Sequence, residues 1–250
     1  MNPPQEPEYF SLLRRFDTPT VLNAIELFDV QPRGSGFADG RLRACFPNMP
    51  PAVGYATTAT FRSARSAKSG DAYSSFVDQV GRFVVEQPAP RIVVFEDLDG
   101  EPAAATFGEV MCTVYKAFGC VGLVTSGAAR DLDQVERLGF PCWSTSVIAS
   151  HGYCRILDVN VPVRVCGLPV SPGDVIHADR NGVATIPAEI VREVALACEK
   201  LAQAENEILH YASAGSVTVE GLRAAQKRCR EGFERIPDQV RRELAQQKPD

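Results

Sequence analysis

Residues 107–133 read FGEVMCTVYKAFGCVGLVTSGAARDLD, and this stretch decides the fold. A Gly-Glu pair followed by apolar residues at helical spacing predicts a helix, and the apolar run Cys120 to Thr125 that follows predicts a buried strand. Arg130 and Asp131 come just past the end of that strand. Because ligands of open α/β sheets bind outside the carboxyl ends of strands, the stretch predicts an α/β protein with a candidate site at this edge.

The flanking sequence extends the same alternation of helices and strands. Before the stretch we expect helices at 17–28 and 72–87 and strands at 54–61 and 91–95; within and after it, helices at 106–118 and 131–138 and a strand at 120–125. Short β-prone runs follow at 141–146, 159–165 and 174–177. This order favours parallel strands joined by helical crossovers.

The composition changes again after Pro187, where long helical, charged sequence begins. We divide the chain into an N-terminal tail at 1–16, a core at 17–190 and a C-terminal helical extension at 191–250, whose last helix is expected to be interrupted near Pro237. The extension is too polar to form a core of its own, so we expect it to pack on the main domain or on a neighbouring subunit.

The composition argues against several classes of protein. The chain has 250 residues with 31 acidic against 26 basic side chains, and the basic residues are scattered, which disfavours nucleic-acid binding. Its eight cysteines show no Cys-x-x-Cys spacing, which is typical of reduced thiols in the cytosol. Neither a signal-peptide pattern nor a run of about 18 apolar residues is present. We therefore expect a cytoplasmic protein that does not bind membranes.

The chemistry-bearing residues of the decisive stretch are Glu109, Arg130 and Asp131. Twenty residues, Val110 to Ala129, separate Glu109 from Arg130, which is one helix plus one strand and returns the chain to the same edge of the sheet. The first turn of the helix also presents the backbone N–H groups of Gly108 to Met111 to a carboxylate or phosphate. The alternatives are that Arg130–Asp131 is a surface pair or helix cap, and that Glu109 only complements the helix dipole.

Other polar residues are interpreted as structural first. His177 alternates within an apolar strand, and His151 and His210 lack metal-ligand spacing. Asp174 and Asp179 flank turns. Glu96, Asp97 and Asp99 form an acidic cluster at the end of a predicted strand and are a possible second site. The alternative is that Asp99–Gly100 is a turn.

The spacing of Glu109 and Arg130–Asp131 resembles the acid-x20-Arg-Asp signature of the class II pyruvate aldolases that cleave 4-hydroxy-4-methyl-2-oxoglutarate and 4-carboxy-4-hydroxy-2-oxoadipate. Glu stands at 109 where that signature more often has Asp. The stretches TPTVLNAIE, FGEVM, SGAARDLD and VNVPVRVCGLPVSPGDVIHADRNGVATIP are similar to the wider superfamily that also contains the ribonuclease E regulator RraA. The resemblance covers roughly residues 17 to 215.

The resemblance implies a layered α/β/β/α swivelling domain with additional C-terminal helices, assembled as a homotrimer or homohexamer. It implies that Asp131 binds Mg²⁺ or Mn²⁺ largely through waters, that Arg130 lies against the C2 oxygen of the substrate and that Glu109 orders water at the metal. The amides of Gly108, Glu109, Val110 and Met111 would hold the substrate carboxylate. An acid from the C-terminal helix of an adjacent subunit would complete the site; Glu205 fits that position, with Glu207 as its rival.

The function implied is a metal-dependent lyase for small 2-oxo acids, by retro-aldol cleavage of 4-hydroxy-2-oxo acids to pyruvate or by decarboxylation of oxaloacetate. Two alternatives stay open. One is a non-catalytic regulator like RraA that binds a protein partner, and the other is a scaffold that keeps the metal site for an unrelated lyase or hydratase.

Overall fold

The computed structural model describes residues 6–68 and 74–246, and its centre is one large mixed sheet. The order of its strands is β1 (Arg43–Ala44), β7 (Cys142–Ser144), β5 (Cys120–Thr125), β3 (Arg91–Asp97), β2 (Ala52–Arg62), β12 (Val175–Asp179) and β13 (Gly182–Ile186), with β9 (Arg155–Val159) also paired to β2. The four strands β7, β5, β3 and β2 run parallel, as the sequence predicts. Their carboxyl ends therefore share one edge.

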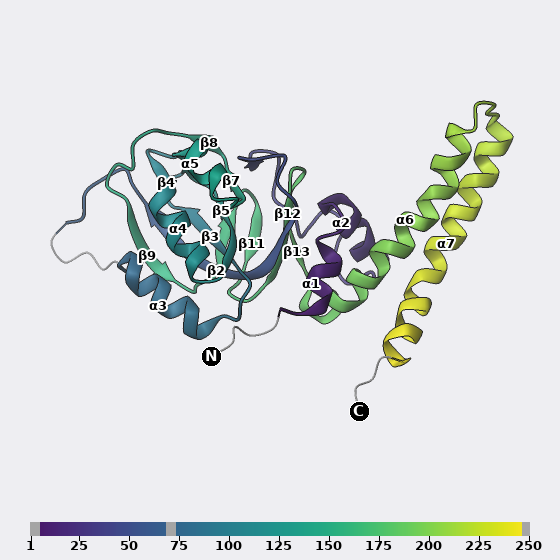
Figure 1. Ribbon diagram of the computed structural model, residues 1–250, viewed down its shortest axis with the longest axis horizontal. Coiled ribbons are helices and arrows are strands. Elements are labelled where there is room, and N and C mark those ends of the chain that lie inside the picture. The colour runs from purple at the N-terminus through teal and green to yellow at the C-terminus, as the bar shows by residue number, and fades with distance from the viewer. Residues whose placement is uncertain (1–5, 69–73, 247–250) are drawn as a thin grey trace.

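Two faces of this sheet are covered differently (Figure 1). Val93 and Phe95 of β3 pack with α3 (Phe76–Glu86), α4 (Glu109–Ala117) and α5 (Leu132–Arg137). Ile92 and Val94, which alternate with them, pack against the hairpin of β10 (Val163–Val165) and β11 (Leu168–Val170). The alternation buries both faces of β3 and explains its continuous apolar sequence. The layered α/β/β/α prediction is confirmed.

A third, small sheet lies beside the decisive stretch. It consists of the parallel strands β4 (Ala105–Phe107), β6 (Ala128–Ala129) and β8 (Ser146–Val147). The helix expected to begin at Thr106 therefore begins at Glu109, because residues 105–107 are drawn into pairing with β6. Gly108 is left as the N-cap residue of α4.

The helices at the other end of the molecule pack around a separate apolar cluster (Figure 1). The helices are α1 (Glu8–Leu13), α2 (Thr18–Glu26), the long α6 (Val191–Ser213) and α7 (Val219–Gln246). The expectation that the C-terminal extension packs on the main domain is met by α6, which contacts α1 and α2. Helix α1 falls within residues 1–16, the predicted tail, and buries Phe10 and Leu13 completely.

One further helix prediction is wrong, and another lies partly outside the described residues. The expected interruption near Pro237 is wrong: α7 runs through Pro237. The buried Ile236 and Val240 on either side offset the one backbone hydrogen bond that a proline cannot donate. Helix α3 begins at Phe76 with a Ser75–Asp78 capping box; the start expected at Gly70–Asp71 lies outside the described residues.

His177 joins the N-terminal helices to the sheet. It is fully buried, its Nε2 lies 3.2 Å from the carbonyl oxygen of Leu13, and its Nδ1 lies 3.0 Å from Thr18 Oγ1. Because a carbonyl only accepts, Nε2 carries a proton, and in the neutral ring Nδ1 then accepts from the Thr18 hydroxyl. Burial lowers the pKa of His177, against the opposing effects of the Leu13 bond and of the Asp179 and Asp17 charges.

This network predicts a loss of stability on mild acidification. Below the ordinary histidine pKa of about 6.5, the unfolded chain binds a proton that folded His177 resists. The contribution of His177 to the free energy of unfolding is therefore complete above that pH. It is lost as the pH falls towards the lowered pKa of His177 in the folded state. Urea unfolding at pH 7.5, 6.5 and 5.5 should show a falling midpoint for the natural protein.

His177→Gln cannot titrate and should flatten that dependence, whereas His210→Gln, which alters an exposed histidine of α6, should leave it intact. Equal pH slopes for the natural protein and His177→Gln would contradict this account.

Candidate functional site

The candidate site is built where the chain leaves β5 and enters α5. Ser126 and Gly127 form the turn, β6 follows, and Asp131 is then the N-cap residue of α5 with φ of 55°, a left-handed conformation that few residues with a side chain adopt. Such strain persists only where surrounding structure holds it, and it gathers at functional sites.

Asp131 is held by the start of α4. Its Oδ2 accepts the backbone N–H of Glu109 at 3.0 Å, and Arg130 Nε lies 3.7 Å from the same oxygen. The turn after β5 and the N-terminus of α4 are thereby fixed to each other, as the twenty-residue interval predicts. Both side chains of the Arg-Asp pair remain about one-third exposed, so both can meet a ligand.

Gly108 is required by this close approach. A Cβ at Gly108 would overlap Asp131 Oδ2 and would lie 2.9 Å from Arg130 Nε. The absence of a side chain lets the helix start reach the carboxylate and the guanidinium together.

The N-terminus of α4 keeps part of its anion-binding capacity. Of the predicted amides, that of Glu109 is used by Asp131, whereas those of Val110 and Met111 belong to the first turn, where a helix provides no internal acceptor. The Glu109 side chain is exposed and makes no ion pair within residues 6–68 and 74–246.

A cavity of about 240 Å³ opens beside these groups. Gly108, Val110 and Met111 of the helix start line it together with Arg130, as do Ala105, Thr106, Phe107, His151 and Cys154. Burial raises the pKa of the Cys154 thiol, and the Arg130 charge opposes that shift. Apart from Arg130 and His151, the walls are mostly apolar.

His151 and Cys154 are the lining residues that sequence reasoning missed. Both lie more than twenty residues beyond Arg130, on the loop between β8 and β9, and their approach depends on the bond from Ala105 N to Ser150 O at 2.7 Å. His151 lacks metal-ligand spacing, and no local sequence pattern marks a contact of this kind.

Two acids of the cluster at the end of β3, Glu96 and Asp99, hold backbone N–H groups. Glu96 accepts the Arg164 N–H, and Asp99 accepts the N–H groups of Ser63 and Ala64. Asp97 is 7% exposed; its Oδ1 accepts the Asp99 N–H, whereas its Oδ2 has no partner among the described residues. Burial raises the pKa of Asp97.

Glu205 is on α6, beside Asn23 of α2. Both helices lie at the end of the molecule opposite α4 and α5 (Figure 1). Burial and the nearby Asp17 charge raise the pKa of Glu205, while a hydrogen bond with Asn23 of α2 opposes the rise. Its rival Glu207 forms an ion pair of 2.6 Å with Arg228 of α7.

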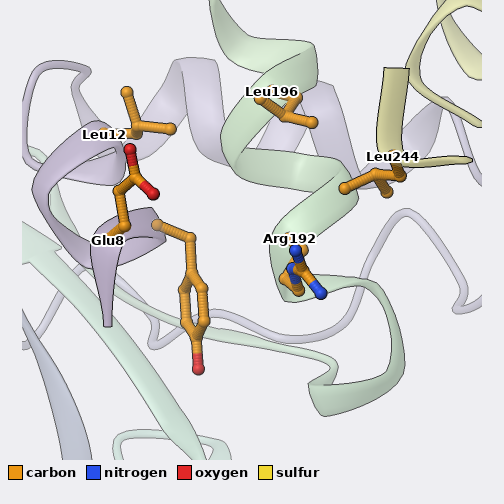
Figure 2. A pocket seen from close by; sticks show the side chains of 6 residues that line it. Glu8, Leu12, Arg192, Leu196 and Leu244 are labelled. Carbon is orange, nitrogen blue, oxygen red and sulfur yellow. The ribbon is translucent and has the colours of Figure 1, made fainter. Parts of the chain in front are cut away.

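A second cavity, of about 260 Å³, lies among the terminal helices. Figure 2 shows Glu8 and Leu12 of α1 facing Arg192 and Leu196 of α6 and Leu244 of α7 across it. It contains none of the predicted site residues. Within residues 6–68 and 74–246, no helix has the length and apolar character needed to cross a bilayer.

The chain is similar to known proteins in both sequence and structure. The family model described as RraA-like, Aldolase/RraA, matches residues 18–185. A Halalkalibacterium halodurans protein is 35% identical over 103 residues, which are 40% of this chain and 49% of the relative. A Stutzerimonas stutzeri protein is 30% identical over 99 residues, 38% of this chain and 59% of the relative. Both carry the provisional name 4-hydroxy-4-methyl-2-oxoglutarate aldolase, and the match spans only about half the length of each.

Two solved structures share the fold. An uncharacterised protein from Pseudomonas syringae has a TM-score of 0.69 at 21% identity, covering 91% of this chain and 96% of that one. RraAS2 from Streptomyces coelicolor, an unusual member of the RNase ES inhibitor RraA family, has a TM-score of 0.61 at 21% identity, covering 84% and 98%. At this identity the likeness concerns the fold.

The packing around Gly127 gives a test of the turn that carries Arg130. A Cβ there would overlap Thr106 Oγ1 and would lie 2.9 Å from Asp97 Oδ2 and 3.2 Å from Thr125 Oγ1. All three neighbours are buried, so Gly127→Ala should lower the free energy of unfolding by about 1–3 kcal/mol, as overpacking does.

Gly81→Ala is the matched control, because Gly81 lies in α3 and a Cβ there meets nothing within 4 Å. It should be neutral or stabilising by up to about 1 kcal/mol in the same urea titration. Equal stability of Gly127→Ala and the natural protein would show that the turn is not tightly packed.

Proposed function

The chain belongs to the RraA-like family of aldolase and RraA proteins, and on that premise we propose that it is a divalent-metal-dependent lyase acting on small 2-oxo acids. The observation that carries the proposal is that Arg130 and the start of α4 line one small cavity, while Asp131 beside Arg130 is bonded to the first N–H of the same helix. The reaction proposed is retro-aldol cleavage of a 4-hydroxy-2-oxo acid to pyruvate, with decarboxylation of oxaloacetate as the related reaction.

The carboxylates of Asp131 and Glu109 suit a metal ion that keeps most of its bound water molecules. Among the described residues no three His, Cys, Asp or Glu side chains converge as a metal cage. Asp131 offers a hard carboxylate that is one-third exposed, with Glu109 on the adjoining helix turn. Mg²⁺ binds proteins through one or two carboxylates and retained waters, so these residues fit Mg²⁺ or Mn²⁺.

The ion, when bound, would supply a positive charge that stabilises the enolate of the pyruvoyl fragment. Asp131 would hold it and Glu109 would orient the water around it. The left-handed backbone at Asp131 and its bond to the Glu109 N–H would keep that carboxylate from turning away.

Arg130 would provide the second stabilising charge. When the C3–C4 bond breaks, its electron pair moves into the C2 carbonyl, the 4-hydroxyl loses its proton and C3 later gains one. A guanidinium at the C2 oxygen stabilises the charge that develops there, and a preorganised donor of this kind is worth about 10²–10³ in rate. The Val110 and Met111 N–H groups would receive the C1 carboxylate.

Glu205 of an adjacent copy is proposed to complete the site. Because α6 lies at the end of the molecule opposite α4 and α5, Glu205 would meet Arg130 only in a second chain, and the raised pKa of Glu205 suits a group that holds a proton. The ion pair between Glu207 and Arg228 favours Glu205 over Glu207. A homotrimer or homohexamer is part of the same proposal.

The primary test is pyruvate release, measured with a coupled lactate dehydrogenase assay. The natural protein should release pyruvate from 4-hydroxy-4-methyl-2-oxoglutarate with Mg²⁺ present and lose that activity with a chelator. Arg130→Ala and Asp131→Ala should fold normally and lose at least about a hundredfold in kcat/KM.

Arg137→Ala and Asp133→Ala are matched controls, because both residues are exposed on α5 close to the pair. They should keep full activity. Normal pyruvate release by Arg130→Ala or Asp131→Ala would exclude the proposed site, and no release from any 2-oxo acid tested would favour the partner-binding role of an RraA-like regulator.

Mixed assemblies test the shared site. Arg130→Ala and Glu205→Gln should each be inactive alone, and unfolding and refolding them together should restore part of the activity, because some interfaces then contain an intact Arg130 beside an intact Glu205. Glu207→Gln should be active alone. Failure of the mixture to regain activity, with both variants oligomeric, would place Glu205 outside the site.

A further inference from the structure

In the cavity beside Arg130, the second carboxylate of a dicarboxylic substrate needs a positively charged partner of its own. Under the proposed function, on which this inference rests, Arg130 serves the C2 oxygen and the α4 amides serve the C1 carboxylate. The remaining walls are Ala105, Phe107 and other groups that carry no positive charge, apart from His151. A second carboxylate buried against such walls without a cation would be costly.

We propose that His151 binds the remote carboxylate of a dicarboxylic 2-oxo acid and so sets the preference of the site for that class of substrate. A single imidazolium in a mostly apolar pocket gives a short, charge-assisted hydrogen bond to a carboxylate. The groups that share the cavity with it are Arg130, whose positive charge adds to the attraction for a dianion, and the Cys154 thiol.

The imidazole is held in one orientation by its own loop. His151 Nδ1 lies 2.8 Å from the carbonyl oxygen of Gly152. Because that carbonyl can only accept, Nδ1 carries the proton, and Nε2 is the nitrogen that remains for a ligand. As imidazolium, the ring donates from Nε2.

The loop itself is fixed on both sides of the histidine. Ser150 accepts the Ala105 N–H at 2.7 Å, and the Tyr153 N–H donates to Ser63 at 3.0 Å. Gly152, at φ of 50°, lies so close to Ser63 that a Cβ would be 2.8 Å from its carbonyl oxygen. These contacts place an exposed histidine on a rigid loop, as a binding group requires.

The loop also ties His151 to the wall that holds Arg130. Ala105, whose N–H bonds to Ser150, begins β4, and β4 pairs with β6, the strand that ends at Ala129 just before Arg130. The Ile148 N–H donates to Ala129 at 2.9 Å. Backbone pairing therefore fixes the position of the loop that carries His151 relative to the strand that precedes Arg130.

The test is binding of two acids of equal chain length that lack the 4-hydroxyl group and cannot be cleaved by the retro-aldol route. Isothermal titration calorimetry with 2-oxoglutarate and with 2-oxopentanoate, at fixed Mg²⁺, compares the dicarboxylate with its monocarboxylate counterpart. The natural protein should bind 2-oxoglutarate more tightly, and His151→Ala should weaken that binding on the order of tenfold or more while leaving 2-oxopentanoate unchanged.

His151→Lys should restore the preference for 2-oxoglutarate, because lysine again places a cation at this position. Cys154→Ser, which changes a side chain of the same cavity but not the charge of the cavity, should keep that preference. Equal Kd values for the two acids in the natural protein, no binding of either, or an equal loss for both in His151→Ala would overturn the inference. Because the readout is binding, a preference that depends on His151 would stand even if no pyruvate were released, in which case the proposed function alone would fail.

Discussion

The hydrogen bond from the Glu109 N–H to Asp131 Oδ2 is the contact on which the candidate site depends. It joins the start of one helix to the turn that follows a central strand, although the two residues are separated by the whole of α4 and β5. Gly108 leaves room for the helix start to come close to the Asp131 carboxylate, and the left-handed backbone conformation of Asp131 turns that carboxylate towards the helix. The consequence is that a carboxylate, a guanidinium and a set of backbone donors are ordered before any ligand arrives, which is the condition for electrostatic stabilisation without reorganisation.

Much of this arrangement is predictable from sequence, because it follows from local rules. The apolar runs of β3 and β5, the capped helix at Thr18 and the strand-end position of Arg130 each have a signature of their own, and their order implies parallel pairing. The small sheet of β4, β6 and β8 has no such signature. Its strands are two or three residues long and pair segments that are far apart in the sequence, so the sequence predicts a helix at Thr106 where the structure has a strand.

The same difference explains which site residues the sequence identified. One helix and one strand separate Glu109 from Arg130, and the pattern of apolar residues in the sequence predicts both. His151 reaches the cavity through the pairing of Ala105 with Ser150, which depends on the small sheet. Pro237 shows the converse case: a strong local signal for a break is overridden by the burial of Ile236 and Val240 against α6.

The positions of Arg130 and Glu205 also give the C-terminal helices a specific task under the proposed function. An acid that must reach a site in another subunit has to be carried on a stiff support, since an error of about one ångström there can cost on the order of a hundredfold in rate. Helix α7 packs along α6 and buries Ala225 and Cys229, and the ion pair between Lys200 and Glu243 joins the two helices. A single exposed helix of this polarity would bend or fray. The pair of helices α6 and α7 would therefore hold Glu205 as rigidly as the contact with Asp131 holds Arg130. Assembly would then bring together a Glu205 of one subunit and an Arg130 of the next that are both already ordered.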